Sequence, residues 1–356
     1  MPISAVDAIS PAFEHTKQQL LKPLRINQWA KLALVGFLAG ELSSGGGGCN
    51  SPQMPRNAGD FSNFHFPHFD PRTVAMVITA FIVSAFVLWV LFTYLNSMMR
   101  FVLFDSVIAK ECHIRESWRR RHEAGMRFFV WHIVLALITW GTMVILIGVP
   151  AAIAFSAGWF KQPGDHIFPL VLGGIFVFLV FFILFVGILL VMVLTKDFVV
   201  PQMALENITA FEGWRRLLPM MKAEKGGYAT YIGMKIVLAI AAGIIFGIAT
   251  FILTLILLIP AGAIGVAAVL AGKAAGMTWG PVTIAWAVVS VIIAFLVIMY
   301  LVSFISVPGI VFFPAYSLYF FAARYPALNA ILNPAPPTPP LPSAPPPYLP
   351  PPQPIG

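Results

Sequence analysis

Three ionisable residues, Glu41, His132 and Lys235, lie within otherwise apolar stretches of the sequence. Such a residue is a candidate for handling protons, ions or ligands, because burying a charge among apolar groups is costly. His132 and Lys235 stand near the beginning of their stretches, and Glu41 stands near the end of a short one. Each side chain can therefore reach a polar boundary. This placement disfavours a proton- or ion-coupled transporter, although a pathway for apolar or lipid-like solutes needs no buried charge.

A second candidate site is a pair of histidines next to an aspartate, His65, His68 and Asp70, in a phenylalanine-rich segment. These residues are candidate metal ligands, but their spacing matches no zinc-binding pattern, and the phenylalanines between them are typical of an aromatic belt. The sequence also contains no HExxH, no GxSxG and no phosphate-binding glycine loop. It therefore predicts no metal, no cofactor and no enzymatic activity.

The composition indicates which elements surround these residues. Apolar residues make up 59% of the 356 residues and charged residues only 10%, whereas soluble domains carry roughly 25% charged residues. Uncharged runs at 74–99, 169–195 and 282–307 each exceed the ~20 residues with which a helix crosses a bilayer. Backbone groups in lipid must be satisfied within the segment, so the runs are expected to be helices. The sequence predicts an all-α, polytopic membrane protein.

We expect six spans in a transmembrane domain at 29–332, preceded by an amphipathic segment at 1–28. The expected spans are 29–44, 74–99, 128–149, 169–195, 228–259 and 282–307. Pro260 is expected to end or kink the fifth span. Residues Ala261–Leu270 are then an interfacial piece, or alternatively a seventh span.

The chain has a net charge of +8, and the distribution of its basic residues along the sequence is typical of a membrane protein. Basic residues are concentrated before the first expected span and after the second and fourth, and the alternate loops carry few. This bias places the basic loops and both termini in the cytoplasm, and nucleic acid is not an expected partner. Cys49 and Cys112 then lie on opposite sides of the membrane, so no disulfide is expected between them.

Related sequences recur along the chain. The segments 101–108, 198–205 and 311–318 resemble one another, and each follows a long apolar run at a nearly constant interval. This recurrence predicts three helical hairpins related by an axis along the membrane normal. Glycines at helical spacing, Gly36 with Gly40 and Gly243 with Gly247, are interpreted as ordinary helix packing.

A Trp-Arg-Arg sequence occurs twice, each time before an expected span. The residues are Trp118, Arg119, Arg120, Trp214, Arg215 and Arg216. Tryptophan is suited to a membrane interface, and basic side chains there gain roughly 1 kcal/mol each beside anionic lipid. We therefore predict contacts with anionic headgroups on the cytoplasmic side, with simple topological anchoring as the alternative.

Residues 333–356 are dominated by proline. This composition predicts a disordered polyproline II tail. Its PxxP spacings and the sequence Pro345-Pro-Pro-Tyr348 are typical of ligands for proline-reading domains, so a protein partner for the tail is one interpretation. Proline-rich composition alone also produces such matches.

The segments 197–206 and 210–216, together with the hairpin rhythm, suggest a family. The chain resembles the bacterial six-helix membrane domains found beside glycerophosphodiester phosphodiesterase catalytic domains, and their stand-alone relatives. The resemblance covers most of residues 10–330 and implies a location in the bacterial cytoplasmic (inner) membrane. The His-Arg-Gly signature of the catalytic partner is absent, so the resemblance implies no phosphodiesterase activity.

These observations favour a non-enzymatic membrane protein, an envelope scaffold or accessory component that acts through lipid or protein contacts. The first alternative is a transporter or channel for an apolar or lipid-like solute, which requires a continuous cavity. The second is an intramembrane enzyme, which requires a convergent cluster of polar residues.

Overall fold

The structure is a computed structural model, and it describes residues 4–22, 25–41, 71–159, 167–276 and 281–334. All regular elements in these ranges are helical. They are α1 (Ile9–Leu21), α2 (Ile26–Leu38), α3 (Pro71–Ala109), α4 (Ile114–Ser156), α5 (Ile167–Leu194), the π-helical turn η3 (Thr195–Val199), α6 (Val200–Glu206), α7 (Ala210–Ala223), α8 (Lys225–Ala274), α9 (Pro281–Ala322) and α10 (Pro326–Leu332). The predicted tail and the segment with the two histidines lie outside the described residues, apart from the first residues of the tail.

Five of the described helices are long and apolar enough to cross a membrane. They lie in α3, α4, α5 with its continuation to Glu206, α8 and α9. Most of their apolar side chains are exposed along the spans, which is the arrangement expected of surfaces that face lipid. The prediction of an all-α fold with several helices long and apolar enough to cross a membrane is confirmed for the described residues.

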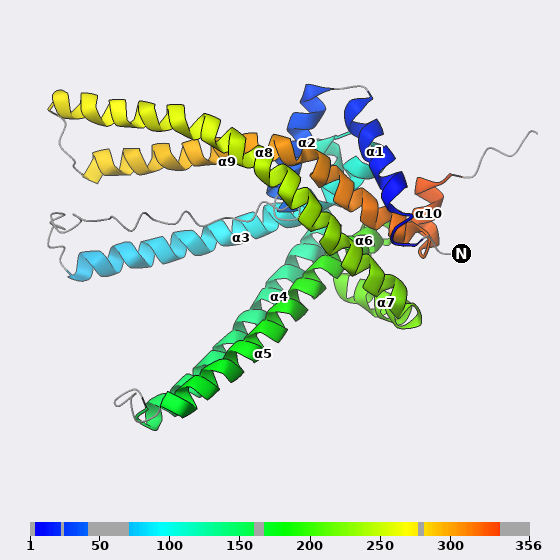
Figure 1. Cartoon of the computed structure of the whole chain (residues 1–356), viewed down its shortest axis with the longest axis horizontal. Coiled ribbons are helices and arrows are strands. Elements are labelled where there is room, and N and C mark those ends of the chain that lie inside the picture. The colour runs from blue at the N-terminus through cyan, green and yellow to red at the C-terminus, as the bar shows by residue number, and fades with distance from the viewer. Residues whose placement is uncertain (1–3, 23–24, 42–70, 160–166, 277–280, 335–356) are drawn as a thin grey trace, which may run out of the picture.

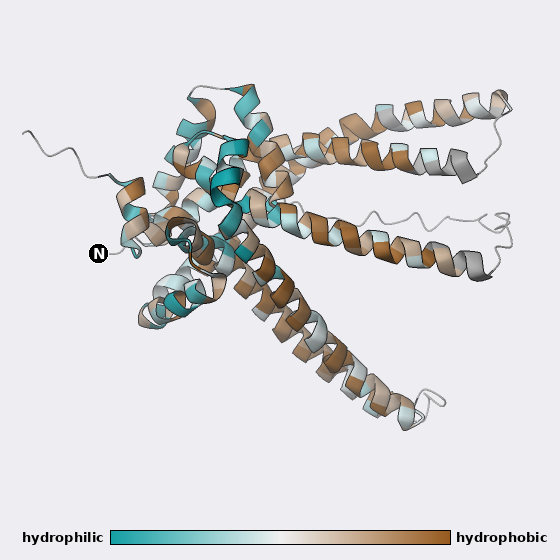
Figure 2. Ribbon diagram, turned by 180° about the vertical axis from the view of Figure 1, so that it is seen from behind, coloured by the Kyte–Doolittle hydropathy of each residue, from teal (hydrophilic) through white to brown (hydrophobic). Residues whose placement is uncertain are grey.

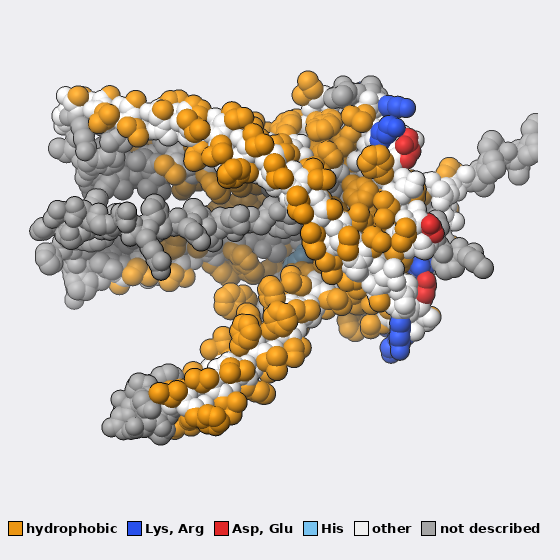
Figure 3. All heavy atoms as spheres, in the orientation of Figure 1, with side chains coloured by type: hydrophobic (Ala, Val, Ile, Leu, Met, Phe, Trp, Pro, Cys, Tyr) orange, Lys and Arg blue, Asp and Glu red, His pale blue; other side chains and the backbone are white. Residues whose placement is uncertain are grey.

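The spanning helices form three arms that meet in one helical body (Figure 1). One arm is α3, the second is α4 with α5, and the third is α8 with α9. The arms are hydrophobic along their length, and the hydrophilic residues gather at the body (Figure 2). On the face shown in Figure 3, acidic and basic side chains likewise lie at the body end.

The core of the protein lies in this body. All three mutually related segments contribute to it, from the end of α3, from η3 with α6, and from the end of α9. Their buried side chains include Phe101, Val102, Leu103, Phe104, Phe198, Val199, Val200, Met203, Val311, Phe313, Ala315 and Leu318. Aromatic rings from α8 join them, with Tyr231 stacked 5.2 Å from Tyr316 and 4.5 Å from Phe320. The sequence similarity of these segments thus coincides with a shared place in the core.

Two expected spans differ from the structure. The helix in the first, α2, has 13 residues, about 20 Å at 1.5 Å per residue, which is shorter than the ~30 Å of hydrocarbon in a bilayer. The end of the predicted span at 42–44 lies outside the described residues. In the fifth span, α8 continues through Pro260 to Ala274. The expectation that Pro260 ends this helix is therefore wrong, because spanning helices tolerate the loss of the single backbone hydrogen bond that proline removes.

The glycines at helical spacing differ in their packing, and those in and just after α2 lie closest to other elements. A Cβ atom at Gly36 would lie 2.5 Å from Cδ1 of Ile310 in α9, and one at Gly40 would lie 2.7 Å from Nδ2 of Asn96 in α3. At Gly247, by contrast, a Cβ atom would meet no atom within 4 Å. Close approach therefore holds α2 to α9 and α3, whereas Gly247 faces open space.

Substituting Gly36→Leu should push α2 away from α9, because Ile310 already fills the space that a side chain would need. We expect a loss of about 1–3 kcal/mol in unfolding free energy, the usual cost of overpacking. Thermal unfolding in mild detergent would measure it, with Gly247→Leu as the matched control. Equal effects of the two substitutions would contradict the packing described here.

Candidate functional site

A basic groove lies where α2 passes the beginning of α4. It encloses about 720 Å³ and is lined by Lys31, His113, Ile114, Arg115, Glu116, Trp118 and Arg119. Arg115 and Arg119 are exposed, and within the described part of the chain no carboxylate lies within 4.0 Å of either guanidinium group or of the Lys31 ammonium group. Three cations and one carboxylate give the groove a net positive charge.

The first turn of α4 adds to this potential. The first amide N–H groups of any helix have no acceptor within the helix. In α4 no side chain caps this end, so these groups also have no side-chain acceptor from the N-cap residue. The N-terminus of a helix favours anions, because its N–H groups and its dipole point toward them. Since His113 and Arg115 flank this end, the groove combines two independent features that attract an anion.

Trp118 places the groove at a polar–apolar boundary. Its ring meets Tyr94 edge to face, with centroids 6.0 Å apart, and Tyr94 lies on the apolar side of Arg100 in α3. The Trp118 side chain is half-buried, whereas Arg119 beside it is exposed. This arrangement matches the level at which indole rings sit in membrane proteins.

Of the six residues predicted to contact headgroups, Trp118 and Arg119 line the groove. Arg120 instead lies with its Nε atom 3.7 Å from a carboxylate oxygen of Asp105. The carboxylate of Asp105 also pairs with the neighbouring Arg121, whose Nη2 atom lies 2.9 Å from Oδ1. Arg120 is therefore partly committed to an ion pair within the protein.

The second Trp-Arg-Arg sequence makes mostly internal contacts. Trp214 donates its indole N–H to Oγ1 of Thr195 at 2.9 Å. Arg215 and Arg216 both pair with Glu212, at 3.0 and 3.2 Å. The two sequences are therefore not equivalent, and only the first borders the groove.

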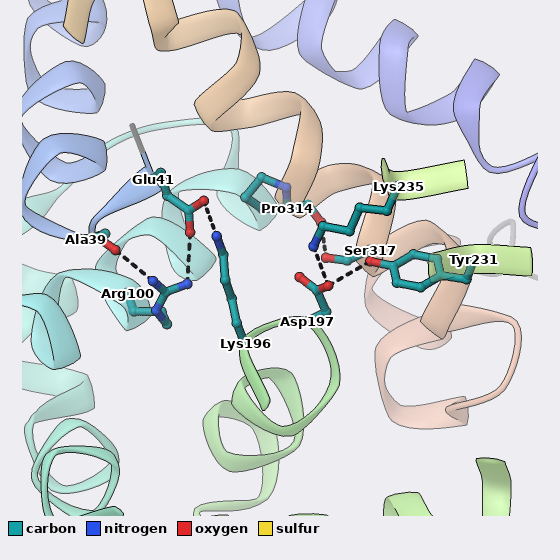
Figure 4. Close-up of polar contacts among 9 residues, drawn as sticks. All are labelled: Ala39, Glu41, Arg100, Lys196, Asp197, Tyr231, Lys235, Pro314 and Ser317. Carbon is teal, nitrogen blue, oxygen red and sulfur yellow. Dashed lines mark hydrogen bonds and ion pairs between the residues drawn. The ribbon is translucent and has the colours of Figure 1, made fainter. Parts of the chain in front are cut away.

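A cluster of buried charges lies at the meeting point of the arms (Figure 4). Glu41 accepts a hydrogen bond of 2.8 Å from Arg100, and it forms a second ion pair with Lys196. Arg100 also donates to the carbonyl oxygen of Ala39 at 2.7 Å. The side chains of Glu41, Arg100 and Lys196 are 1%, 11% and 19% exposed, so the cluster is largely withdrawn from solvent.

The other half of the cluster is centred on Asp197. Its carboxylate pairs with Lys235 and accepts a hydrogen bond of 3.0 Å from the hydroxyl group of Tyr231. Lys196 and Asp197 are neighbours in η3, where the amide of Val200 bonds to the carbonyl of Thr195, five residues back. This π-helical turn directs the two side chains toward different partners, as Figure 4 shows.

Part of this cluster was not predicted as a site. In the sequence, Arg100 and Lys196 are simply basic residues that follow apolar runs, and the position of Lys235 predicts that its side chain reaches a polar boundary. The available signal was the acidic residues: Glu41 and Asp197 stand at the ends of apolar runs, where an acidic residue contributes little to topology.

The remaining candidates have structural partners. Nδ1 of His132 lies 3.2 Å from the hydroxyl oxygen of Ser97. Cys112 is a free, buried cysteine, and burial raises the pKa of its thiol. Within the described ranges, no three His, Cys, Asp or Glu residues are grouped as metal ligands would be; His65, His68 and Asp70 lie outside those ranges.

Comparison with known proteins identifies a family. The model of the family of unknown function DUF7544 matches residues 3–331, and the chain therefore belongs to that family. No curated protein and no solved structure matches the chain. The resemblance to membrane domains of glycerophosphodiester phosphodiesterases remains a prediction.

Substituting Lys235→Met should leave the buried Asp197 carboxylate without its ion-pair partner. Removing one partner of a buried ion pair costs about 3–5 kcal/mol, whereas an exposed pair such as Arg215–Glu212 contributes about 0–1 kcal/mol. Equilibrium unfolding in mild detergent should show a large loss for Lys235→Met, a small loss for Arg215→Met, and partial recovery in Lys235→Met/Asp197→Asn. A double variant no more stable than Lys235→Met would show that the pair is not coupled.

Proposed function

We propose that this member of DUF7544 is a non-enzymatic membrane scaffold whose basic groove binds anionic lipid headgroups. The observation that carries the proposal is the groove itself, in which Lys31, Arg115 and Arg119 lie beside an uncapped helix N-terminus and a half-buried tryptophan. A phosphate group there would accept hydrogen bonds from two guanidinium groups and from backbone amides.

The proposal includes a topology. The body would lie on the cytoplasmic face of the bacterial inner membrane with both chain termini, and the arms would cross the bilayer as parts of three related hairpins. Two observations support it: the hydrophilic residues gather at the body (Figure 2), and the three related segments all lie in its core. The Pro-rich tail would then extend into the cytoplasm, where a proline-reading domain could bind it.

The alternative of a transporter for an apolar or lipid-like solute would need a continuous cavity along the arms. The groove and the buried charge cluster described above lie in the body, at the ends of the arms. These polar features fit a protein that holds headgroups at one surface of the membrane.

Reporter fusions test the topology. A fusion at Lys222, in the body, should report the cytoplasm, because basic residues are retained on that side. A fusion at Gln162, in the sequence between α4 and α5, and one at Ala274, the last residue of α8, should report the opposite side. A periplasmic signal at Lys222 would contradict the proposed orientation.

Replacing Arg115 and Arg119 with glutamine should reduce the anionic lipid that co-purifies with the protein. Two basic residues at roughly 1 kcal/mol each correspond to about a 30-fold loss of affinity. Native mass spectrometry in mild detergent would measure bound lipid, and the loss should shrink at high salt, where wild-type binding also weakens.

The matched control is Lys222→Gln/Lys225→Gln, which removes the same charge from exposed positions outside the groove. An Arg115→Lys/Arg119→Lys variant keeps the charge but loses bidentate contacts, and should bind with intermediate affinity. If the groove variant retains as much anionic lipid as this control, the headgroup proposal is wrong.

A further inference from the structure

Glu41 occupies a position that resembles a bound anion. Its two carboxylate oxygens are shared between Arg100 from α3 and Lys196 from η3, which belong to different elements. Two converging cations with a shared oxyanion are the usual arrangement of a phosphate or carboxylate site. Here the oxyanion belongs to the chain itself, at the end of α2.

Among the described residues of this cluster, Arg100, Lys196 and Lys235 are basic, and Glu41 and Asp197 are acidic. Asp197 pairs with Lys235 and accepts a hydrogen bond from Tyr231, whereas Glu41 pairs with both Arg100 and Lys196. A phosphate group presents several oxygen atoms and up to two negative charges, so it would pair with the same two cations.

A small cavity adjoins the two cations. It has a volume of about 30 Å³, and its lining includes Glu41, Lys196, Pro201, Pro314 and Ser317. That volume is enough for about one or two water molecules. It therefore leaves room beside the carboxylate position for the additional oxygen atoms of a tetrahedral oxyanion.

The attachment of Glu41 allows it to leave. The helix α2 ends at Leu38, and Gly40 has a φ of +70°, a conformation that glycine adopts without strain. Glu41 lies three residues beyond the end of α2, so its carboxylate can move away from the cations without unwinding that helix.

We propose that Arg100 and Lys196 form a binding site for a phosphate-type oxyanion, and that Glu41 is its internal occupant. Binding of a phosphate group displaces the Glu41 carboxylate and releases the end of α2 from α3 and η3. The phosphate group comes either from free phosphate or from a phosphomonoester lipid headgroup. This site is separate from the basic groove and does not depend on it.

The test measures phosphate binding to the purified full-length protein at constant ionic strength. Wild type should bind inorganic phosphate weakly, because Glu41 competes. Glu41→Gln should bind it at least about tenfold more tightly, equivalent to about 1.4 kcal/mol, and phosphate should raise its unfolding temperature. Adding Lys196→Met to Glu41→Gln should remove the gain.

Two further variants serve as controls. Glu212→Gln neutralises a carboxylate that also pairs with two basic residues, but on α7, and should not change phosphate binding. Glu41→Asp keeps the charge with a shorter side chain that cannot reach both cations, and should show a smaller gain. If Glu41→Gln does not fold, the Glu41→Asp variant decides the result.

Nanodiscs of phosphatidylcholine with and without phosphatidic acid distinguish the two sources of phosphate. A gain with inorganic phosphate identifies free phosphate as a sufficient ligand, and a gain only with phosphatidic acid identifies the headgroup. No gain with either ligand in a folded Glu41 variant overturns the proposal. The Arg115→Gln/Arg119→Gln variant should leave the gain intact, so failure of the groove and failure of this site are separable.

Discussion

The pairing of buried charges where the arms meet is the interaction on which the rest of the structure depends. Arg100, Lys196 and Lys235 stand at the ends of apolar stretches, and their side chains are at most 19% exposed. A buried charge without a partner costs several kcal/mol, so each cation fixes a carboxylate from another element. Glu41 thereby ties α2 to α3 and η3, and Asp197 ties η3 to α8.

This constraint explains why the arms can diverge while the body stays packed. Lipid tails are as apolar as the side chains of the arms, so burial of apolar surface gives spanning helices little reason to associate. The body offers other interactions: the aromatic contacts of Phe198 and Tyr231, the close approach of Gly36 to Ile310, and the ion pairs. Helix association is therefore concentrated at the polar end of the arms, where these interactions are available.

The sequence predicts the helical membrane class because long uncharged runs have one stable solution in lipid. It does not predict the extent of α2 and α8, because composition cannot show that Glu41 turns back to Arg100 or that a helix continues through Pro260. For a similar reason, the sequence cannot show that only one of the two Trp-Arg-Arg sequences borders the groove. Trp118 and Trp214 have the same local sequence context, but only tertiary contacts reveal that Trp214 is hydrogen-bonded to Thr195, whereas Trp118 borders a groove.

The groove and the buried cluster are connected by α2. Lys31 lines the groove from this helix, and Glu41, just beyond its end, occupies the cluster. Between these two points α2 is held against α9 by the contact of Gly36 with Ile310. Release of Glu41, which lies beyond the last residue of the helix, would therefore leave Lys31 in place. Under the two proposals the groove and the cluster bind their anions independently, although one helix contributes to both.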